Sequence, residues 1–288
     1  MLNFKKKILI VSHDAGGAEI ISHFVKKYKF NPDFYLKGPA KKIFRANLNK
    51  IKIIKGIKSK LNNYKIVIVG TSLNNDFEYN VIKYSLKKKI KVIAFIDHWV
   101  NYLNRFIRNG KLILPNEIIV GDKDAYKIAK KKFKDVKITY YKNYYFDSFK
   151  SQLKKIKNIQ KILYVSSNMD TFKGKIVSDK KILSQVISKI QSNKVIKRKK
   201  MLFIRKHPSE KYHKYKYLKN LKSNLIIKID KNFALKDSFK DTGFVIGYDS
   251  MALVVAKIYG LKTINLYVDN KNNKIPKKYI DYYLKIKK

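Results

Sequence analysis

The chain has no cysteine and little of several other residue types that often carry chemistry. Of its 288 residues, five are histidine, one is tryptophan and 20 are acidic. Without cysteine, neither a disulfide framework nor a zinc site built on thiolates can form. The few acidic and histidine residues show no clustering at metal-ligand spacing. We therefore expect a protein that works without a bound metal.

Long apolar runs are missing as well. None approaches the roughly 20 residues that a helix needs to cross a bilayer. The first apolar run passes directly into Ser-His-Asp-Ala-Gly-Gly, residues 12–17. That order is typical of a first strand and its loop rather than of a signal peptide. The sequence therefore predicts a cytoplasmic protein.

Basic residues, in contrast, are abundant, and the formal net charge is +47 at pH 7. Such a charge suits nucleic-acid binding, but only five of the 67 basic residues are arginine, and the lysines are spread along the whole chain. Dedicated nucleic-acid modules add base-reading arginines and stacking aromatic rings. We therefore expect no nucleic-acid partner. Dispersed lysines do suit a peripheral contact with an anionic membrane, such as the inner face of the plasma membrane.

Short apolar runs recur along the chain, with amphipathic stretches between them. Runs that are apolar throughout are typical of parallel strands covered on both faces by helices. The sequence therefore predicts an α/β protein with two Rossmann-like sheets. The runs of the first series are residues 7–12, 64–70, 90–97, 116–121 and 136–141, and those of the second are 160–167, 200–207, 224–230, 243–250 and 261–268.

Residues 142–160 lack a strand signal and separate the two series. We place the domain boundary there, which gives an N-terminal domain over residues 1–148 and a C-terminal domain over residues 149–288. The two parallel sheets are expected to face each other across a cleft. In sheets of this kind, ligands bind beyond the carboxyl ends of the strands. The loops that follow the strands are therefore the candidate sites.

The loop after the first strand carries the candidate catalytic base. His13 and Asp14 lie at the strand exit, and either side chain could remove a proton from a substrate. Gly16 and Gly17 follow and would let the backbone approach a ligand closely. The alternative is a tight turn in which Asp14 caps a helix.

The loop after residues 90–97 carries a second group of candidate ligand contacts. Asp97, His98 and Trp99 place an aromatic ring beside hydrogen-bonding groups, which suits the face of a sugar or a base. The alternative is a capped helix with Trp99 in the core. A helix is also predicted over residues 122–133, capped by an aspartate at position 122 or 124.

The C-terminal half carries candidate phosphate-binding residues. Arg205 offers a planar guanidinium and His207 an imidazole at the end of one strand. Pro208, with Glu210 close behind, fits a helix start whose free N–H groups also favour anions. The alternative is a strand end with surface charge.

Two serines complete this candidate phosphate site. Ser250 opens an apolar helix, so its hydroxyl and the free backbone N–H groups could hold a phosphate, or the hydroxyl could simply cap the helix. Ser167, after the strand at residues 160–167, could contact the same ligand, although serine is common in ordinary turns.

These motifs resemble those of a known family. Arg-Lys-His-Pro at residues 205–208, followed by GYDSMALVVAKIYGLKTINL at residues 247–266, is similar to the C-terminal half of GT-B glycosyltransferases. The likeness is greatest to the bacterial sialyl- and Kdo-transferases and CDP-glycerol glycerophosphotransferases of capsule and lipopolysaccharide synthesis. It implies that His207 and Ser250 bind donor phosphates with help from Arg205, and that Asp14 or His13 acts as the base. The N-terminal half resembles the family in architecture only.

The resemblance implies a cytoplasmic, metal-independent transferase of GT-B type. It would move a sugar or a polyol phosphate from a nucleotide-activated donor, its co-substrate, to a glycan or lipid-linked acceptor, with no bound cofactor. Two alternatives stay open. One is a non-hydrolysing UDP-sugar 2-epimerase, which shares the fold and needs no acceptor. The other is a basic protein that binds nucleic acid or another polyanion, whose affinity would fall steeply with salt.

Overall fold

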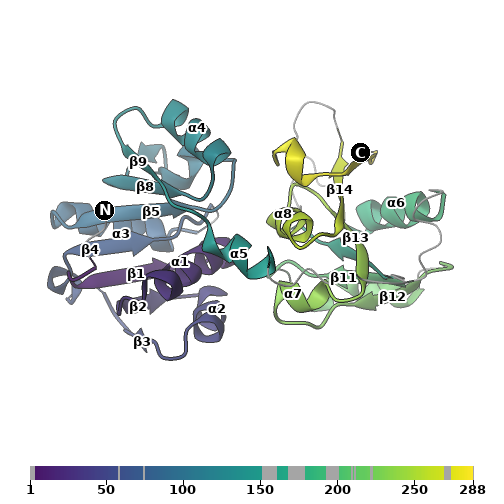
Figure 1. Ribbon diagram of the computed structural model, residues 1–288, viewed down its shortest axis with the longest axis horizontal. Helices are drawn as coiled ribbons and strands as arrows, with labels where there is room; N and C mark the ends of the chain where they lie inside the picture. The colour runs from purple at the N-terminus through teal and green to yellow at the C-terminus, as the bar shows by residue number, and fades with distance from the viewer. Residues whose placement is uncertain are drawn as a thin grey trace. The chain divides into compact units, whose positions relative to one another are not determined.

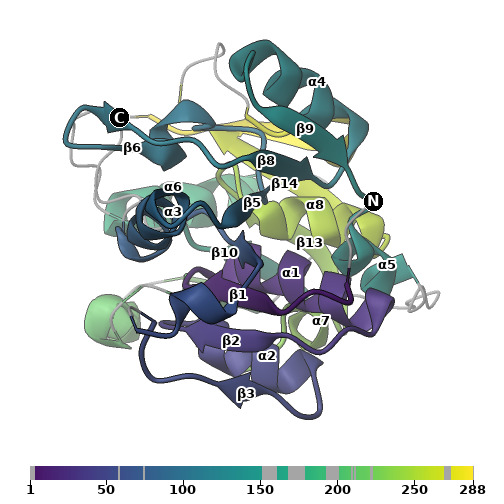
Figure 2. The same cartoon turned by 90° about the vertical axis from the view of Figure 1, so that its left-hand side faces the viewer.

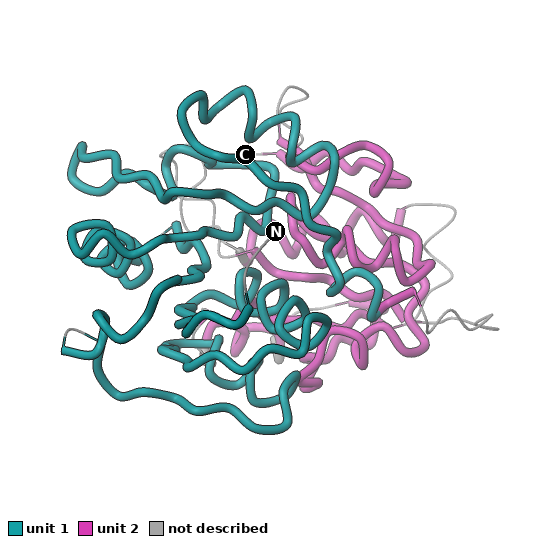
Figure 3. The backbone as a smooth tube through the Cα atoms, turned by 60° about the vertical axis from the view of Figure 1, so that its left-hand side comes forward, with its two compact units in different colours: residues 1–148 teal, residues 149–288 magenta. Residues whose placement is uncertain are grey.

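The computed structural model describes residues 4–57, 59–73, 75–150, 161–167, 179–192, 201–208, 210, 212–220, 223–268 and 274–287. The chain divides into two compact units, Met1–Ser148 and Phe149–Lys288, which Figure 3 colours separately. We call them unit 1 and unit 2. Within the described residues, no helix is both long enough and apolar enough to span a membrane.

Unit 1 is built on a parallel sheet. Its strands are β1 (Ile8–Ser12), β2 (Asp33–Leu36), β3 (Lys52–Ile53), β4 (Ile66–Val69), β5 (Lys91–Ile96), β8 (Glu117–Val120) and β9 (Lys137–Tyr140). They lie in the order β3-β2-β1-β4-β5-β8-β9, which Figure 2 shows from its lower to its upper part. β1, β4 and β8 are buried along their whole length, as expected for apolar strands covered on both faces.

Helices cover both faces of this sheet. On one face, Phe24 of α1 and Phe44 of α2 pack with the even-numbered residues Ile8 and Ile10 of β1. Asp122 caps α4, because its carboxylate accepts a hydrogen bond of 2.8 Å from the N–H of Ala125, which settles the choice between the two predicted caps. The α-helices that flank the sheet are α1 (Ala15–Tyr28), α2 (Ala40–Asn47), α3 (Phe77–Lys87) and α4 (Lys123–Lys132). α5 (Tyr144–Lys150) spans the boundary between the two units.

Unit 2 repeats the plan (Figure 1). Its strands are β10 (Lys161–Val165), β11 (Met201–Arg205), β12 (Ile226–Ile229), β13 (Thr242–Gly247), β14 (Lys262–Tyr267) and β15 (Tyr282–Lys285). They are parallel, in the order β12-β11-β10-β13-β14-β15. The described helices are α6 (Asp179–Ser192), α7 (Leu235–Ser238), α8 (Met251–Ile258) and two 3₁₀ helices, Tyr212–Asn220 and Lys277–Tyr279. Ile182, Val186 and Ile190 of α6, spaced four residues apart, pack into the core of this unit.

Each sheet has a point at which the strand order reverses. In unit 1 the chain leaves β1 for β2 and β3 on one side and then returns to β4 on the other. In unit 2 it leaves β10 for β11 and β12 and then returns to β13. The predicted α/β fold with two parallel, Rossmann-like sheets is thus confirmed. The reversal points, β1/β4 and β10/β13, are where such sheets bind ligands.

Two features differ from the sequence-based expectation. The short strands β2, β3 and β15, and the antiparallel pair β6 (Ile107–Arg108) and β7 (Lys111–Leu112), were not predicted. The prediction of a helix beginning at Pro208 was wrong, because this proline lies in a turn. Glu210 closes the turn: its side chain accepts the N–H of His207 at 3.0 Å, and its own N–H donates to the His207 carbonyl at 2.9 Å.

Candidate functional site

His13 and Asp14 form a hydrogen-bonded pair where β1 ends. His13 Nδ1 lies 2.7 Å from Asp14 Oδ1. Asp14 occupies the N-cap position of α1, yet its carboxylate makes no capping bond to the helix. A carboxylate accepts hydrogen bonds, so Nδ1 carries the proton in the neutral imidazole and Nε2 is left as the basic nitrogen. The pair therefore has the arrangement of a base oriented by a carboxylate.

Gly38 lies against the imidazole of His13. Its φ of 51° is in the left-handed region, which glycine adopts readily. A Cβ at this position would come within 2.8 Å of both Nε2 and Cε1 of His13. Any side chain here would cover the nitrogen that the Asp14 contact leaves basic.

A buried carboxylate, Glu78 of α3, fixes the backbone of the loop that follows β1. Glu78 is 2% exposed. One of its oxygens accepts the backbone N–H of His13 at 2.8 Å, and the other accepts the Ser72 hydroxyl at 2.6 Å. Burial raises the pKa of Glu78, against the lowering effect of these two hydrogen bonds, and the charge of Asp14 raises it further. Glu78 was missed by sequence reasoning because it lies 65 residues from His13.

Gly16 and Asp97, predicted on separate loops, lie against each other. A Cβ at Gly16 would be 1.8 Å from Oδ2 of Asp97, so only glycine leaves room for this carboxylate. The carboxylate thus lies beside the first turn of α1, where the helix dipole favours an anion. Its other oxygen accepts Arg105 Nη1 at 2.8 Å, and the same nitrogen donates to the carbonyl of Thr71 at 2.7 Å. Arg105 therefore links the ends of β4 and β5.

Trp99 lies in the interior instead of lining a site. It is 6% exposed, and its indole N–H donates to Asp122 at 3.1 Å. His98 is half-buried, and its Nδ1 accepts the backbone N–H of Trp99 at 2.9 Å. Gly17 serves packing too, because a Cβ there would lie 3.3 Å from the Cα of Gly70. We therefore assign Trp99 and Gly17 to the architecture of the loops rather than to sugar binding.

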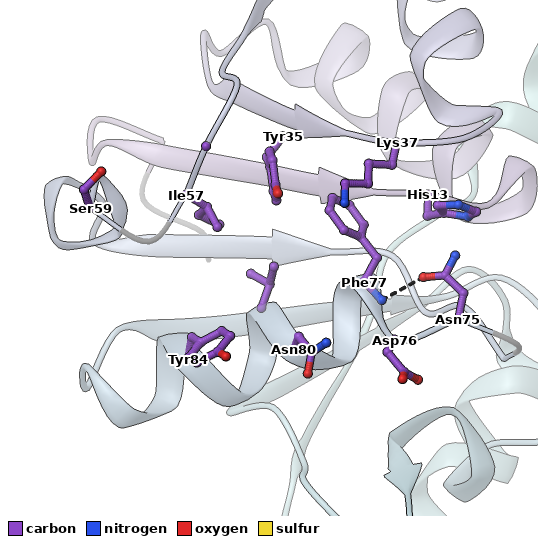
Figure 4. Close-up of a pocket in the computed structure, with 12 residues that line it drawn as sticks. His13, Tyr35, Lys37, Ile57, Ser59, Asn75, Asp76, Phe77, Asn80 and Tyr84 are labelled. Atoms are coloured by element: carbon purple, nitrogen blue, oxygen red, sulfur yellow. Dashed lines mark hydrogen bonds between the residues drawn. The ribbon is translucent and has the colours of Figure 1, made fainter.

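A groove of about 740 Å³ opens beside His13 and follows α3 (Figure 4). Its volume is typical of small-molecule sites. We call it the α3 groove. Sequence reasoning missed it because one wall comes from β2, which was not predicted. Its lining includes His13, Tyr35, Lys37, Asn75, Phe77 and Tyr84.

In unit 2, the ends of β10 and β13 are joined where the strand order reverses. The Ser167 hydroxyl donates to the Tyr248 carbonyl at 2.8 Å. Asn265, which is fully buried, exchanges two hydrogen bonds with Asp249 and so holds that residue at a φ of 40°. Ser250 is the N-cap of α8, its hydroxyl accepting the N–H of Ala252 at 3.3 Å, as the capping alternative predicted.

His207 lies in the exposed turn that follows β11. Glu210, whose side chain is 1% exposed, fixes this turn to the neighbouring strand, because it also accepts the Ser166 hydroxyl at 2.6 Å. β11, β10 and β13 are adjacent, so His207, Ser167 and Ser250 share one edge of the sheet. These are groups that can hold an anion. In the described part of the chain, no three acidic or histidine side chains come together as a metal site.

Arg205 is engaged by the protein itself. Its Nη1 lies 2.9 Å from Asp230 Oδ2 and 2.6 Å from the Ser238 hydroxyl, and its Nη2 donates to the Phe233 carbonyl at 2.8 Å. Burial alone would raise the pKa of Asp230, but hydrogen bonds from Ser238 and Arg205 outweigh it and hold that pKa below its usual value. These contacts give Arg205 a structural role, and we leave it out of the candidate phosphate site.

Comparison with known proteins identifies the fold. No family model and no curated protein matches the chain. Among solved structures, UDP-GlcNAc 2-epimerase from Neisseria meningitidis bound to UDP-GlcNAc is similar, with a TM-score of 0.66 and 12% identity over 94% of this chain and 85% of that one. The S. aureus MnaA-UDP co-structure is similar with a TM-score of 0.65 and 12% identity, over 90% of this chain and 78% of that one. E. coli ADP-heptose lps heptosyltransferase II is similar with a TM-score of 0.50 and 11% identity, over 97% of this chain and 90% of that one. The chain thus has the GT-B type of fold, with two Rossmann-like domains.

The buried Glu78 generates a first prediction. In Glu78→Gln the amide oxygen can accept the His13 N–H, and the Ser72 hydroxyl can turn to accept the amide N–H. We expect this variant to unfold with a free energy equal to or above that of the wild type at about pH 8. Because the folded-state pKa is raised, wild-type stability falls as the pH rises from the usual glutamate value towards the raised one. The glutamine variant lacks this slope, and urea unfolding across that pH range measures the difference.

Glu78→Ala is the matched control. It leaves the His13 N–H and the Ser72 hydroxyl buried without this partner, and each such group costs about 1–3 kcal/mol. If the glutamine variant were as unstable as the alanine variant at every pH, the charge itself would hold the loop and the hydrogen-bond account would be wrong.

A second prediction concerns Arg205. Arg205→Ala leaves the buried Asp230 carboxylate without its cation, so we expect the free energy of unfolding to drop by about 3–5 kcal/mol. Urea unfolding measures this loss, and Arg205→Met combined with Asp230→Leu should recover most of it. Arg45→Ala, at an exposed position on α2, is the control and should stay within about 0.5 kcal/mol of wild type. If Arg205→Ala is instead as stable as the wild type but no longer binds nucleotide, Arg205 binds phosphate and its structural role is wrong.

Proposed function

We propose that this chain is an enzyme that transfers a sugar, or a polyol phosphate, from a nucleotide-activated donor to a glycan or lipid-linked acceptor. The observation that carries the proposal is the His13–Asp14 pair, which lies where the strand order of unit 1 reverses and whose histidine lines the α3 groove. A base beside a groove of this size suits a second substrate with a hydroxyl to be deprotonated.

The donor would be held by unit 2. His207, Ser167 and Ser250 lie on one edge of its sheet, and α8 begins there. Such groups favour phosphate oxygens through hydrogen bonds and the helix dipole. Two structures with this fold hold UDP-GlcNAc and UDP, which supports a nucleoside diphosphate as the activating group.

The chemistry follows from these placements. The acceptor hydroxyl oxygen forms a bond to the anomeric carbon of the donor sugar as the bond between that carbon and the phosphate oxygen breaks. His13 Nε2 takes the hydroxyl proton, and Asp14 stabilises the imidazolium that results. The bonding electrons leave with the phosphate, whose new charge the donors of unit 2 stabilise. In this proposal neither a metal nor a cofactor takes part.

A 2-epimerase acting on a UDP-sugar is the second candidate. The structures with the higher TM-scores, 0.66 and 0.65, include UDP-GlcNAc 2-epimerase from Neisseria meningitidis. An epimerase isomerises its substrate with no acceptor, so it would make no use of a neighbouring groove for a second sugar. That groove is why we place transfer first.

A polyanion-binding role is the third candidate, and it rests on the net charge of +47. The same charge supports a peripheral contact with an anionic membrane surface, where lipid-linked acceptors would lie.

The donor site generates a third prediction. In a thermal-shift panel of CMP, CDP, UDP, GDP and ADP, we expect one nucleotide to raise the melting temperature by several degrees, because a ligand at about 100 times its Kd stabilises by about 2.7 kcal/mol. In the complex the Ser167 hydroxyl would turn from the Tyr248 carbonyl to the phosphate. His207→Ala and Ser167→Ala should then each weaken binding of this nucleotide by about tenfold or more, since each removes a hydrogen bond to a charged group. Ser184→Ala, at an exposed serine of α6, is the matched control.

The result that would overturn the donor site is equally specific. If no nucleotide shifts the melting temperature while a polyanion does, and that shift disappears in high salt, the chain is a polyanion-binding protein.

A fourth prediction separates transfer from epimerisation and tests the base. With the selected nucleotide carrying different sugars, a transferase releases free nucleotide only slowly until an acceptor is added, whereas an epimerase converts the donor sugar without one. His13→Ala should lower kcat by about 10²–10⁴-fold, the usual contribution of a general base, and Asp14→Asn should lower it too. Nucleotide affinity should be unchanged in both variants. Wild-type kcat in His13→Ala would remove the pair from the mechanism.

A further inference from the structure

The α3 groove extends well beyond the candidate base. In Figure 4, His13 and Asn75 lie at one end and Ser59 and Tyr84 at the other. Phe77 and Tyr84 are seven residues apart on α3, which at 1.5 Å per residue separates them by about 10 Å along the helix axis. A ligand that fills the groove is therefore longer than a group held at His13 alone.

Aromatic rings and small polar groups alternate along the groove. Near His13 the rings of Tyr35 and Phe77 have centroids 4.8 Å apart. At the far end Tyr84 is 41% exposed, so part of its ring faces outward, and Asn80 and Ser59 lie nearby in the lining. Apolar ring faces bordered by amides and hydroxyls suit sugar rings, which have apolar faces and polar edges.

A lysine, Lys37, lies at the end of the groove near His13. Lys37 is exposed, and its Nζ lies 4.9 Å from the centroid of the Phe77 ring. Asp76, an acidic residue of the lining, is paired with Arg108 at 2.6 Å. That arginine offsets the charge of Asp76, so the positive charge of Lys37 can act on a ligand.

We propose that the α3 groove binds an acidic oligosaccharide of at least two sugar units. The acidic group of the terminal sugar lies at Lys37, and the ring of the preceding sugar lies on Tyr84. The binding stands by itself, but its use rests on the proposed function: the bound glycan is the acceptor, and its terminal hydroxyl lies near His13. The enzyme then selects acceptors by length as well as by charge.

Calorimetric titration of the full chain tests this proposal. The probes are two acidic series, α2,8-linked sialic acid and α1,4-linked galacturonic acid, as monomer, dimer and tetramer, with maltose oligomers as the uncharged series. We expect the dimer and tetramer of at least one acidic series to bind at least about tenfold more tightly than the monomer, a difference of about 1.4 kcal/mol. Uncharged oligomers should bind more weakly than that series.

Two variants locate the binding, each with a matched control in unit 1. Tyr84→Ala should abolish the preference for dimer over monomer, whereas Tyr140→Ala, at a tyrosine of β9 that is 46% exposed, should keep it. Lys37→Ala should abolish the preference for acidic over uncharged oligomers, whereas Lys130→Ala, at an exposed lysine of α4, should keep it. Circular dichroism and melting temperature confirm that each variant is folded.

Three results would overturn the proposal: no binding of either acidic series, equal affinity for monomer and dimer, or equal losses in Lys37→Ala and Lys130→Ala, which would show diffuse attraction to a basic surface. Failure of the proposed function looks different. If the dimer binds in the groove but no nucleotide-sugar is ever used, the transferase assignment fails and the binding site stands. If the wild type transfers sugar to monomer and dimer equally well, only the groove proposal fails.

Discussion

One contact recurs at the carboxyl edge of both sheets: a buried glutamate accepts the backbone N–H of a histidine and the hydroxyl of a serine from the neighbouring strand end. Glu78 does so for His13 and Glu210 for His207, and the serine hydroxyl bond measures 2.6 Å in both. Beyond the last strand residue the ladder of the sheet no longer pairs the backbone, and in both loops a glutamate side chain supplies the acceptor for the histidine N–H. Every role proposed for the two histidines depends on these glutamates, because they fix the backbone from which each imidazole projects.

The two glutamates differ in what surrounds their charge. Lys214 lies 2.8 Å from Glu210 and provides a cation. Around Glu78 the nearby charge that acts on its pKa is Asp14, which raises it in the same direction as burial. A protonated Glu78 can still accept the His13 N–H and donate to a serine hydroxyl, so the loop can keep its shape when the proton is taken up. What changes is the negative charge beneath the His13–Asp14 pair.

The central strands could be predicted because burial on both faces demands apolar side chains at every position. β1 contains Ile-Leu-Ile-Val and β4 is Ile-Val-Ile-Val, so both are recognisable from their own residues. Strands near the edges of a sheet do not need apolar side chains at every position. β3 is two residues long, and β15, Tyr-Tyr-Leu-Lys, is largely exposed, so their pairing partners rather than their composition make them strands. Since β2 was missed for the same reason, the wall of the α3 groove was missed with it.

Three of the arginines in this lysine-rich chain fix loops at strand ends. Arg105, Arg108 and Arg205 each donate to two or more acceptors at strand ends, and their side chains are 9%, 16% and 19% exposed. A planar guanidinium with five N–H groups can bridge a carboxylate and several carbonyls at once, whereas an ammonium is a compact and strongly hydrated charge. Lysine can therefore cover the surface of this protein but cannot replace arginine where a loop is fixed. The partners lie far along the chain, 25 residues away for Asp230 and Arg205, so no local pattern could distinguish a structural arginine from one that binds phosphate.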